Sequence, residues 1–408
     1  MEDAAQLYCR CTEGRLVTTF NVKGWCPGAL RPMMSADGLV VRVRPRAGRI
    51  TQAQAIGIAE AARAFGSGII DLSSRANIQL RGIRTEAYAD LLAQLDSLAL
   101  LDATAAIETR RNIIVAPLDD ENRTGNALAL ALEAAIANCN LSLPSKFGFA
   151  IDTGDARLLA DVSADIRIER GQQNQVLVRV DTASYGVPVQ LQHAADVAIE
   201  VAQWFLDSGG VKDGRGRMAA HIASGAQLPD HLQGRVLPVS SRSRPVPGIV
   251  SQGAFVAVAF GSLQAETLDA LARNASELHI TPWRMFFLPD VTVMPSGAEL
   301  VTDCEAPILR IEACPGQPFC SQAMMETRSL ARQIAPHIPS GALLHISGCA
   351  KGCACSRSVD WTLVGSPNGF DLISNGDASS KPLARGLAVS ELSADPSRFL
   401  RGNDDLRL

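Results

Sequence analysis

The chain has 408 residues, of which 47% are hydrophobic and 20% are charged, with 38 basic against 42 acidic residues. This composition is typical of a folded protein of roughly two to three domains, and the near-neutral charge argues against a partner that is a nucleic acid. No apolar run is long enough to span a membrane and the first residues lack a signal-peptide pattern, so we expect a cytoplasmic protein with no membrane partner.

A strand, a helix and a second strand are predicted near the start of the chain. Residues 39–43 alternate in the manner of a strand, 51–65 have the pattern of a helix, and 69–80 are predicted as one further strand. In that last strand, residues 75, 77, 79 and 81 would share a polar face, while residues 76, 78 and 80 would face the core. The first half would therefore begin with a βαβ-like lobe.

Basic side chains recur along this lobe and after the helix predicted over 85–98. They are Arg42, Arg44, Arg75, Arg81, Arg111 and Lys146. Arginine binds carboxylates through two parallel hydrogen bonds, so one interpretation is a surface for a polycarboxylate ligand. The other interpretation is the ordinary solvated face of an antiparallel sheet. Alternation alone does not separate the two.

The sequence also contains an internal repeat. Residues 149–168 align without a gap with 344–363, so that Ile151 corresponds to Ile346 and Asp165 to Asp360. The strand–helix–strand order of 38–82 recurs, with gaps, over 253–288, and residues 228–247 between the copies have the Pro, Ser and Arg content of a linker. We therefore expect an α+β protein of two pseudo-symmetric halves, each with a βαβ-like lobe and a larger α/β lobe.

Four of the ten cysteines form two pairs in the second half. Five residues separate Cys314 from Cys320, and three separate Cys349 from Cys353, which follow an apolar strand predicted over 342–346. Glycines and prolines make both pairs parts of tight loops, and a helix predicted over 321–336 would begin beside the first pair. Four thiolates on two loops suit a [4Fe–4S] cluster, with structural zinc or inert thiols as alternatives.

The cysteine motif and three further segments, residues 74–79, 111–113 and 143–147, resemble the siroheme- and [4Fe–4S]-containing sulfite and nitrite reductase superfamily. Within it, residues 26–33, 36–44, 313–316 and 347–354 are similar to the precorrin-3B synthase family. The resemblance covers nearly the whole chain. It implies ferredoxin-like lobes over 1–118 and 236–292, and sulfite-reductase-type lobes over 119–235 and 293–408, the last of which would bind the cluster.

The same resemblance implies a monooxygenase of aerobic cobalamin biosynthesis that oxidises precorrin-3A with O2 at C20 and closes a γ-lactone. It implies a [4Fe–4S] cluster on Cys314, Cys320, Cys349 and Cys353, a mononuclear non-haem iron, and electrons that come ultimately from NADH. The six histidines do not reveal the ligands of that iron, and no dinucleotide fingerprint is present, so we expect a separate electron-donating reductase. Arg75, Arg111 and Lys146 would clamp the carboxylates of the macrocycle, with Arg42, Arg44 and Arg81 as further candidates.

Two other functions remain open. One is a siroheme-dependent sulfite or nitrite reductase, and the other is an iron–sulfur electron carrier or a zinc-stabilised binding protein. Reductases of the superfamily have two lysines, one residue apart, where this chain has Lys146 and Gly148, which weakens the first alternative. No role is assigned to Cys9, Cys11, Cys26 or Cys355.

Overall fold

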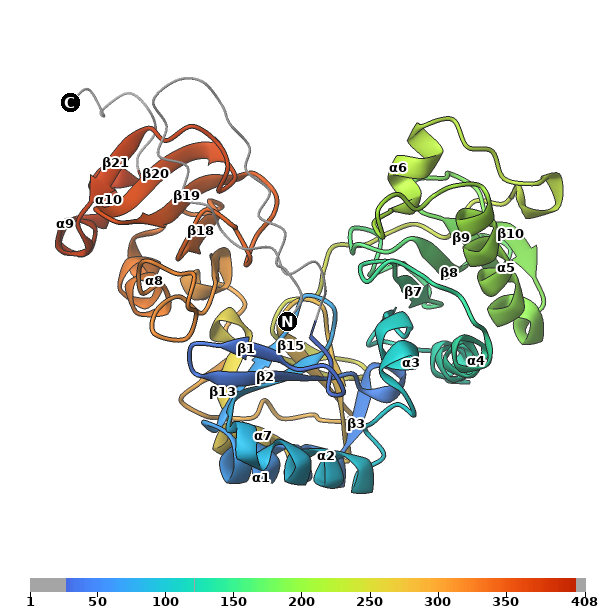
Figure 1. Cartoon of the computed structure of the whole chain (residues 1–408), viewed down its shortest axis with the longest axis horizontal. Helices are drawn as coiled ribbons and strands as arrows, with labels where there is room; N and C mark the ends of the chain where they lie inside the picture. Colours follow the sequence, from blue (N-terminus) through green and yellow to red (C-terminus); the bar gives the residue numbers. More distant parts are fainter. Residues whose placement is uncertain (1–26, 121, 401–408) are drawn as a thin grey trace, which may run out of the picture. The chain divides into compact units, whose positions relative to one another are not determined.

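The computed structural model describes residues 27–120 and 122–400, so the predictions about Cys9, Cys11 and Cys26 lie outside the described residues. The chain divides into two compact units. The larger lies within residues 25–311 and 318–321, and the smaller comprises 312–317 together with the chain from residue 322 onward (Figure 1). In the described parts of both units, no helix is both long and apolar enough to cross a membrane.

Two related sheets form the first part of the larger unit. One has the strand order β1-β2-β5-β4-β13 and the other β11-β12-β15-β14-β3, with β16 paired to β12. Their bounds are β1 Met33–Ser35, β2 Gly38–Val43, β3 Arg49–Thr51, β4 Ile69–Leu72, β5 Ile78–Ile83, β11 Gly248–Val250, β12 Gly253–Val258, β13 Ser262–Gln264, β14 Glu277–Ile280, β15 Met285–Pro289 and β16 Leu300–Val301.

Each of these sheets receives one short strand from the other half of the repeat. β3 follows β2 in the chain but pairs with β14, where Ile50 lies opposite Leu278. In the same way, β13 follows β12 but pairs with β4, where Leu263 lies opposite Ile70. All four of these side chains are buried. The two halves are therefore joined by exchanged strands and share one core.

Helices α1 (Gln52–Phe65), α2 (Tyr88–Ser97) and α7 (Ala265–Ala272) lie together against these sheets (Figure 1). α1 begins with a capping box in which Thr51 and Gln54 satisfy each other's backbone N–H groups. Its buried face is composed mainly of alanine, including Ala55 and Ala62, which allows close packing against α7. The turns before the exchanged strands also match, because Ala47 and Phe260 both adopt positive φ there, at 49° and 60°.

A third sheet, with the order β10-β9-β8-β7-β6, completes the larger unit and is covered by α4 and α5. The bounds are α3 Ala105–Arg110, β6 Ile113–Val115, α4 Thr124–Asn138, β7 Phe149–Asp152, β8 Ile166–Arg170, β9 Val176–Val180, β10 Val187–Val189, α5 Ala194–Asp207 and α6 Met218–Ala223. The smaller unit contains the corresponding sheet β17-β18-β19-β20-β21, with β17 Ile311–Ala313, α8 Arg328–Ile334, β18 Leu344–Ser347, β19 Val359–Ser366, β20 Gly369–Gly376, β21 Ala384–Leu387, α9 Val389–Ala394 and α10 Pro396–Phe399.

The register of these two sheets confirms the ungapped repeat. β7 and β8 are parallel with Ile151 opposite Ile168, and β18 and β19 are parallel with Ile346 opposite Leu363. The Asp165 carboxylate accepts a hydrogen bond from Gly148 N at 2.9 Å, and the Asp360 carboxylate accepts one from the corresponding Leu343 N at 2.8 Å. The predicted α+β fold of two pseudo-symmetric halves is thus confirmed.

Two local predictions were wrong. The helix predicted over 321–336 begins only at Arg328, because the turns of the first cysteine loop continue to Thr327. The strand predicted over 69–80 is two strands, since Ala76 adopts φ 53° and turns the chain between β4 and β5. The segment 228–247, predicted as a linker, contains no regular strand and forms isolated bridges to the third sheet region through Val236, Pro238 and Ser241.

The repeat provides a matched pair of variants, Asp165 in the larger unit and Asp360 in the smaller one. Asp165 is fully buried and also binds Arg217 Nε at 2.9 Å and Met218 N at 2.8 Å, whereas Asp360 is exposed. We predict that Asp165→Asn lowers the free energy of unfolding by about 2 to 3 kcal/mol, because a partly buried guanidinium loses its charged partner. Asp360→Asn should lower the free energy of unfolding by less than half as much, because Asp360 is exposed. Urea unfolding measures both, and equal losses would contradict this interpretation.

Candidate functional site

Three of the six predicted basic residues of the first half, Arg44, Arg75 and Lys146, lie at the loop of residues 145–148. Arg75 Nη2 donates to Lys146 O at 3.1 Å. Asn112 Nδ2 donates to Ser145 O and Phe147 O, and its Oδ1 accepts from Arg44 Nη1 at 2.9 Å. Hydrogen bonds from the side chains of Arg75, Asn112 and Arg44 therefore bring Arg44, Arg75 and Lys146 to one place in the larger unit.

These three cations differ in exposure. Lys146 is exposed, Arg75 is half-buried, and Arg44 is 5% exposed. Arg42 is half-buried on β2 and donates through Nε and Nη2 to Gln79 Oε1 on the neighbouring strand β5. Lys146, Arg75 and Arg42 are thus the predicted cations with the most accessible side chains.

Arg81 and Arg111 lie instead in buried ion pairs. Arg81 forms a bidentate pair with Asp37 at 3.0 Å and donates to the Phe319 carbonyl. Arg111 pairs with Asp102 at 2.9 Å and donates to the Arg44 carbonyl at 2.8 Å. Both guanidinium groups hold protein segments in place, and Arg111 fixes the backbone of Arg44. Their predicted contact with a ligand stays a prediction.

Gly148 stands where the reductases have a second lysine, and its surroundings leave little space. A side-chain Cβ built there would lie 3.2 Å from Asn112 O and 3.6 Å from Arg75 Nη1. Asn112 O is itself held by the hydrogen bond from Phe149 N, at 2.8 Å. A lysine at this position would crowd fixed backbone and place its charge beside the Arg75 guanidinium, so the local structure is built for glycine.

A buried carboxylate that the sequence did not single out anchors the backbone of Ala29 and Leu30. Glu108 accepts hydrogen bonds from Ala29 N at 2.5 Å and Leu30 N at 3.1 Å, and Tyr88 donates to Ala29 O at 2.7 Å. A side chain on Gly28 would collide with the Glu108 carboxylate. Burial raises the pKa of Glu108, opposed by the two backbone N–H groups and the nearby charge of Arg44. Glu108 thus positions a segment that the chain shares with the resembled family.

Three of the four predicted cluster cysteines belong to the smaller unit. Cys314 directly follows β17 and is buried, while Cys349 and Cys353 follow β18 and are half-buried and exposed. Gly348 N donates to Cys314 Sγ at 3.2 Å, which joins the two loops. A backbone N–H directed at sulfur stabilises a thiolate, and hydrogen bonds of this kind tune the reduction potential of iron–sulfur clusters. The donor set and this contact therefore fit a cluster.

The remaining cysteines are placed as follows. Cys320 lies in the 318–321 segment of the larger unit and is half-buried. Cys355 is buried and donates from Sγ to Arg357 O at 3.5 Å, so it has a local structural role. Within residues 27–120 and 122–400, no three His, Cys, Asp or Glu side chains are arranged to hold a metal ion. The assignment of the cluster to Cys314, Cys320, Cys349 and Cys353 remains a prediction.

Comparisons with known proteins agree on one family. The family model of the nitrite/sulfite reductase ferredoxin-like half domain matches residues 31–98. A precorrin-3B synthase from Sinorhizobium sp is 30% identical over 94% of this chain and 90% of its own length. A chloroplastic ferredoxin–nitrite reductase from Betula pendula is 23% identical over 80% of this chain and 67% of its own length.

A solved structure has the same fold. The NirA protein of Mycobacterium tuberculosis matches with a TM-score of 0.60 and 17% identity, over 88% of this chain and 80% of its own. This likeness concerns the fold, whereas the similarity to the synthase extends over both sequences. The chain therefore belongs to the precorrin-3B synthase family, within the sulfite and nitrite reductase superfamily.

Proposed function

We propose that this protein is an oxidoreductase that converts precorrin-3A to precorrin-3B. One oxygen atom of O2 enters the macrocycle at C20, the ring A acetate closes a γ-lactone, and the second oxygen atom leaves as water with two electrons and two protons. The observation that carries the proposal is the similarity to a precorrin-3B synthase over 94% of the chain. The cations gathered at the loop of residues 145–148, Lys146 with Arg75 and Arg44 beside it, support it, because the substrate is a polycarboxylate.

Lys146, Arg75 and Arg42 are the groups that we propose to bind the substrate carboxylates, with Arg44 beside them. A guanidinium group can form two parallel hydrogen bonds to one carboxylate, which fixes the orientation of that carboxylate. Several such contacts would fix which face of the macrocycle is oxidised. Arg111 and Arg81 would act through their neighbours, since Arg111 holds the backbone of Arg44 and Arg81 holds the Phe319 carbonyl. Glu108 would hold residues 28–30 next to Arg44.

We further propose that Cys314, Cys320, Cys349 and Cys353 hold a [4Fe–4S] cluster, which when bound supplies electrons one at a time. The Gly348 N–H would stabilise the charge on Cys314. A mononuclear non-haem iron and a separate reductase that draws on NADH complete the proposal.

Isotope labelling tests the proposed reaction. Anaerobically purified, reduced protein is mixed with precorrin-3A and oxygen-18 gas, and the product is analysed by mass spectrometry. We expect a product that contains one labelled oxygen atom. Unchanged precorrin-3A, together with reduction of sulfite or nitrite by the same preparation after loading with siroheme, would contradict the proposal and favour the reductase function suggested by the nitrite reductase relatives.

Cysteine variants test the cluster ligands. We predict that Cys349→Ser loses most of its iron and acid-labile sulfide, because a serine oxygen is a poor replacement for a thiolate ligand. Cys355→Ser is the matched control and should retain both, since the Cys355 thiol contacts the Arg357 carbonyl. Iron, sulfide and zinc are determined per chain. Equal cluster content in the two variants, or zinc in place of iron, would refute the assignment.

An arginine variant tests the substrate contacts. Arg75→Ala should weaken binding of the macrocycle by about tenfold, because one charge-assisted contact is lost, while the iron content stays unchanged. Arg63→Ala is the control, since Arg63 lies on α1 and pairs only loosely with Glu266, at 3.8 Å. Anaerobic titration of the macrocycle absorbance measures both. Affinity that is the same in the two variants would count against the role of Arg75.

A further inference from the structure

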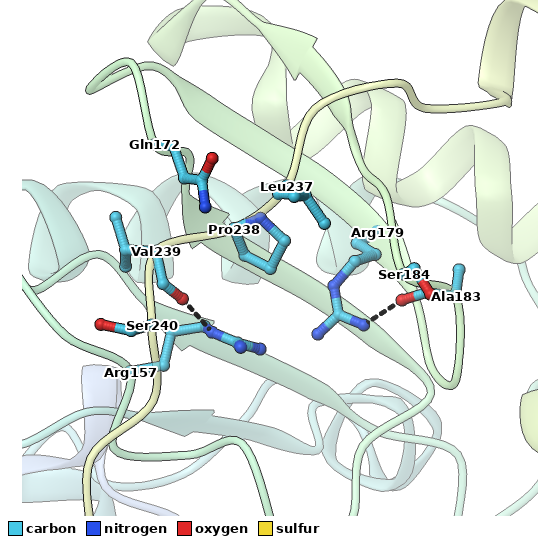
Figure 2. Close-up of a pocket in the computed structure, with 9 residues that line it drawn as sticks. All are labelled: Arg157, Gln172, Arg179, Ala183, Ser184, Leu237, Pro238, Val239 and Ser240. Carbon is cyan, nitrogen blue, oxygen red and sulfur yellow. Dashed lines mark hydrogen bonds between the residues drawn. The ribbon is translucent and has the colours of Figure 1, made fainter.

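A cavity of about 250 Å³ opens in the larger unit, between the third sheet and the chain that follows α6. None of its lining residues belongs to the cations proposed to bind the macrocycle. They are Arg157, Gln172, Arg179, Ala183, Ser184, Leu237, Pro238, Val239 and Ser240 (Figure 2). Two arginines and no acidic side chain are thus among the residues that line it.

A buried glutamate fixes the two arginines. Arg179 donates to the Glu169 carboxylate from Nε at 2.8 Å and from Nη2 at 3.0 Å, and Arg157 Nη1 lies 3.4 Å from the same carboxylate. Glu169 is 1% exposed and does not line the cavity. Figure 2 shows the two guanidinium groups turned toward each other across the cavity. Glu169 therefore orients both guanidinium groups through these hydrogen bonds.

Both guanidinium groups retain donors. Apart from the Glu169 contacts, Arg157 Nε donates to Val239 O at 2.7 Å and Arg179 Nη1 donates to Ala183 O at 2.5 Å. Each guanidinium carries five N–H donors, so each of the two arginines keeps N–H groups that take part in none of these bonds. With side chains only 16% and 9% exposed, the two arginines present these donors where water has limited access. Such donors favour a ligand that can accept several hydrogen bonds.

The outer wall of the cavity is formed by residues 237–240, which belong to the segment that connects the two halves. This segment is hydrogen-bonded to Arg157, through Arg157 N to Ser240 O at 2.9 Å and Arg242 N to Arg157 O at 3.0 Å. Val239 N also donates to Arg170 O at 2.9 Å. Leu237 and Pro238 supply an apolar surface beside the polar groups. The connecting chain is thus hydrogen-bonded to the third sheet region on both sides of the cavity wall that it forms.

We propose that this cavity binds a small, doubly charged oxyanion, either inorganic phosphate or a short dicarboxylate. The N–H groups that the two guanidinium groups retain can donate together to the oxygens of one carboxylate or phosphate group, and the volume excludes a macrocycle. Asp152 is buried next to Glu169, where burial raises its pKa to about 6, and it is not among the residues that line the cavity. The bound anion would join the third sheet to the connecting chain and hold the latter in place.

Calorimetric titration tests this site in the full-length protein. Inorganic phosphate and, separately, succinate are titrated at constant ionic strength in chloride buffer. We expect saturable binding of at least one of them. We also expect slower hydrogen exchange of residues 236–242 in its presence. No saturation by either anion below about 10 mM would overturn the proposal.

Ser184 provides matched variants because it lines the cavity and is exposed. Ser184→Glu places a negative charge at the rim and should weaken binding by about tenfold or more, while Ser184→Gln should stay close to the wild type. Arg157→Gln, which leaves Glu169 paired with Arg179, should also weaken binding. Unchanged affinity in both Ser184→Glu and Arg157→Gln would show that the anion binds elsewhere and would overturn the proposal.

Discussion

The exchange of two short strands between the ferredoxin-like halves is the constraint on which the larger unit depends. β3 leaves the sheet of β2 and pairs with β14, and β13 leaves the sheet of β12 and pairs with β4. Neither half can therefore complete its sheet alone. Arg44 lies between β2 and β3, so its backbone is held at one end by the first sheet and at the other end by the second. This explains how Arg44, whose side chain is long and flexible, occupies a fixed position beside the 145–148 loop.

The repeat also explains how one fold supports different chemistry in its two copies. The parallel strands β7 and β8 have the same register as β18 and β19, and an aspartate binds the same backbone N–H in both. Gly154 in the first copy corresponds to Cys349 in the second. After β7, the first copy instead has Arg157, which joins the ion-pair network of Glu169. The shared strands position a loop, and the loop sequence decides whether it carries thiols or charges.

The sequence predicted the repeat because aligned positions keep the same separation and the same residue types. It also predicted the α+β fold and the segments that carry Arg44, Arg75 and Lys146. The break at Ala76 was missed because a positive φ in a non-glycine residue has no local sequence signal. The helix start was placed too early because Ser321 has the character of an N-cap, while the turns of the cysteine loop continue to Thr327.

The roles of Arg81 and Arg111 needed the structure, because their acidic partners lie on other parts of the fold. Asp37 precedes Arg81 by 44 residues, and Asp102 precedes Arg111 by nine. Alternation along a strand shows that two arginines share a face, but it does not show which of them meets a carboxylate of the same protein. The strand exchange was hidden for a similar reason, since β3 and β13 have only three residues each.

The central claim is that this chain combines an iron–sulfur cluster with a cationic site for a tetrapyrrole that arrives as substrate. The visible absorption spectrum of protein purified without oxygen tests it most directly. We expect the broad, brown absorption of a [4Fe–4S] cluster without the intense bands of a tightly held tetrapyrrole. Strong siroheme bands, or a colourless protein that lacks acid-labile sulfide, would contradict the claim.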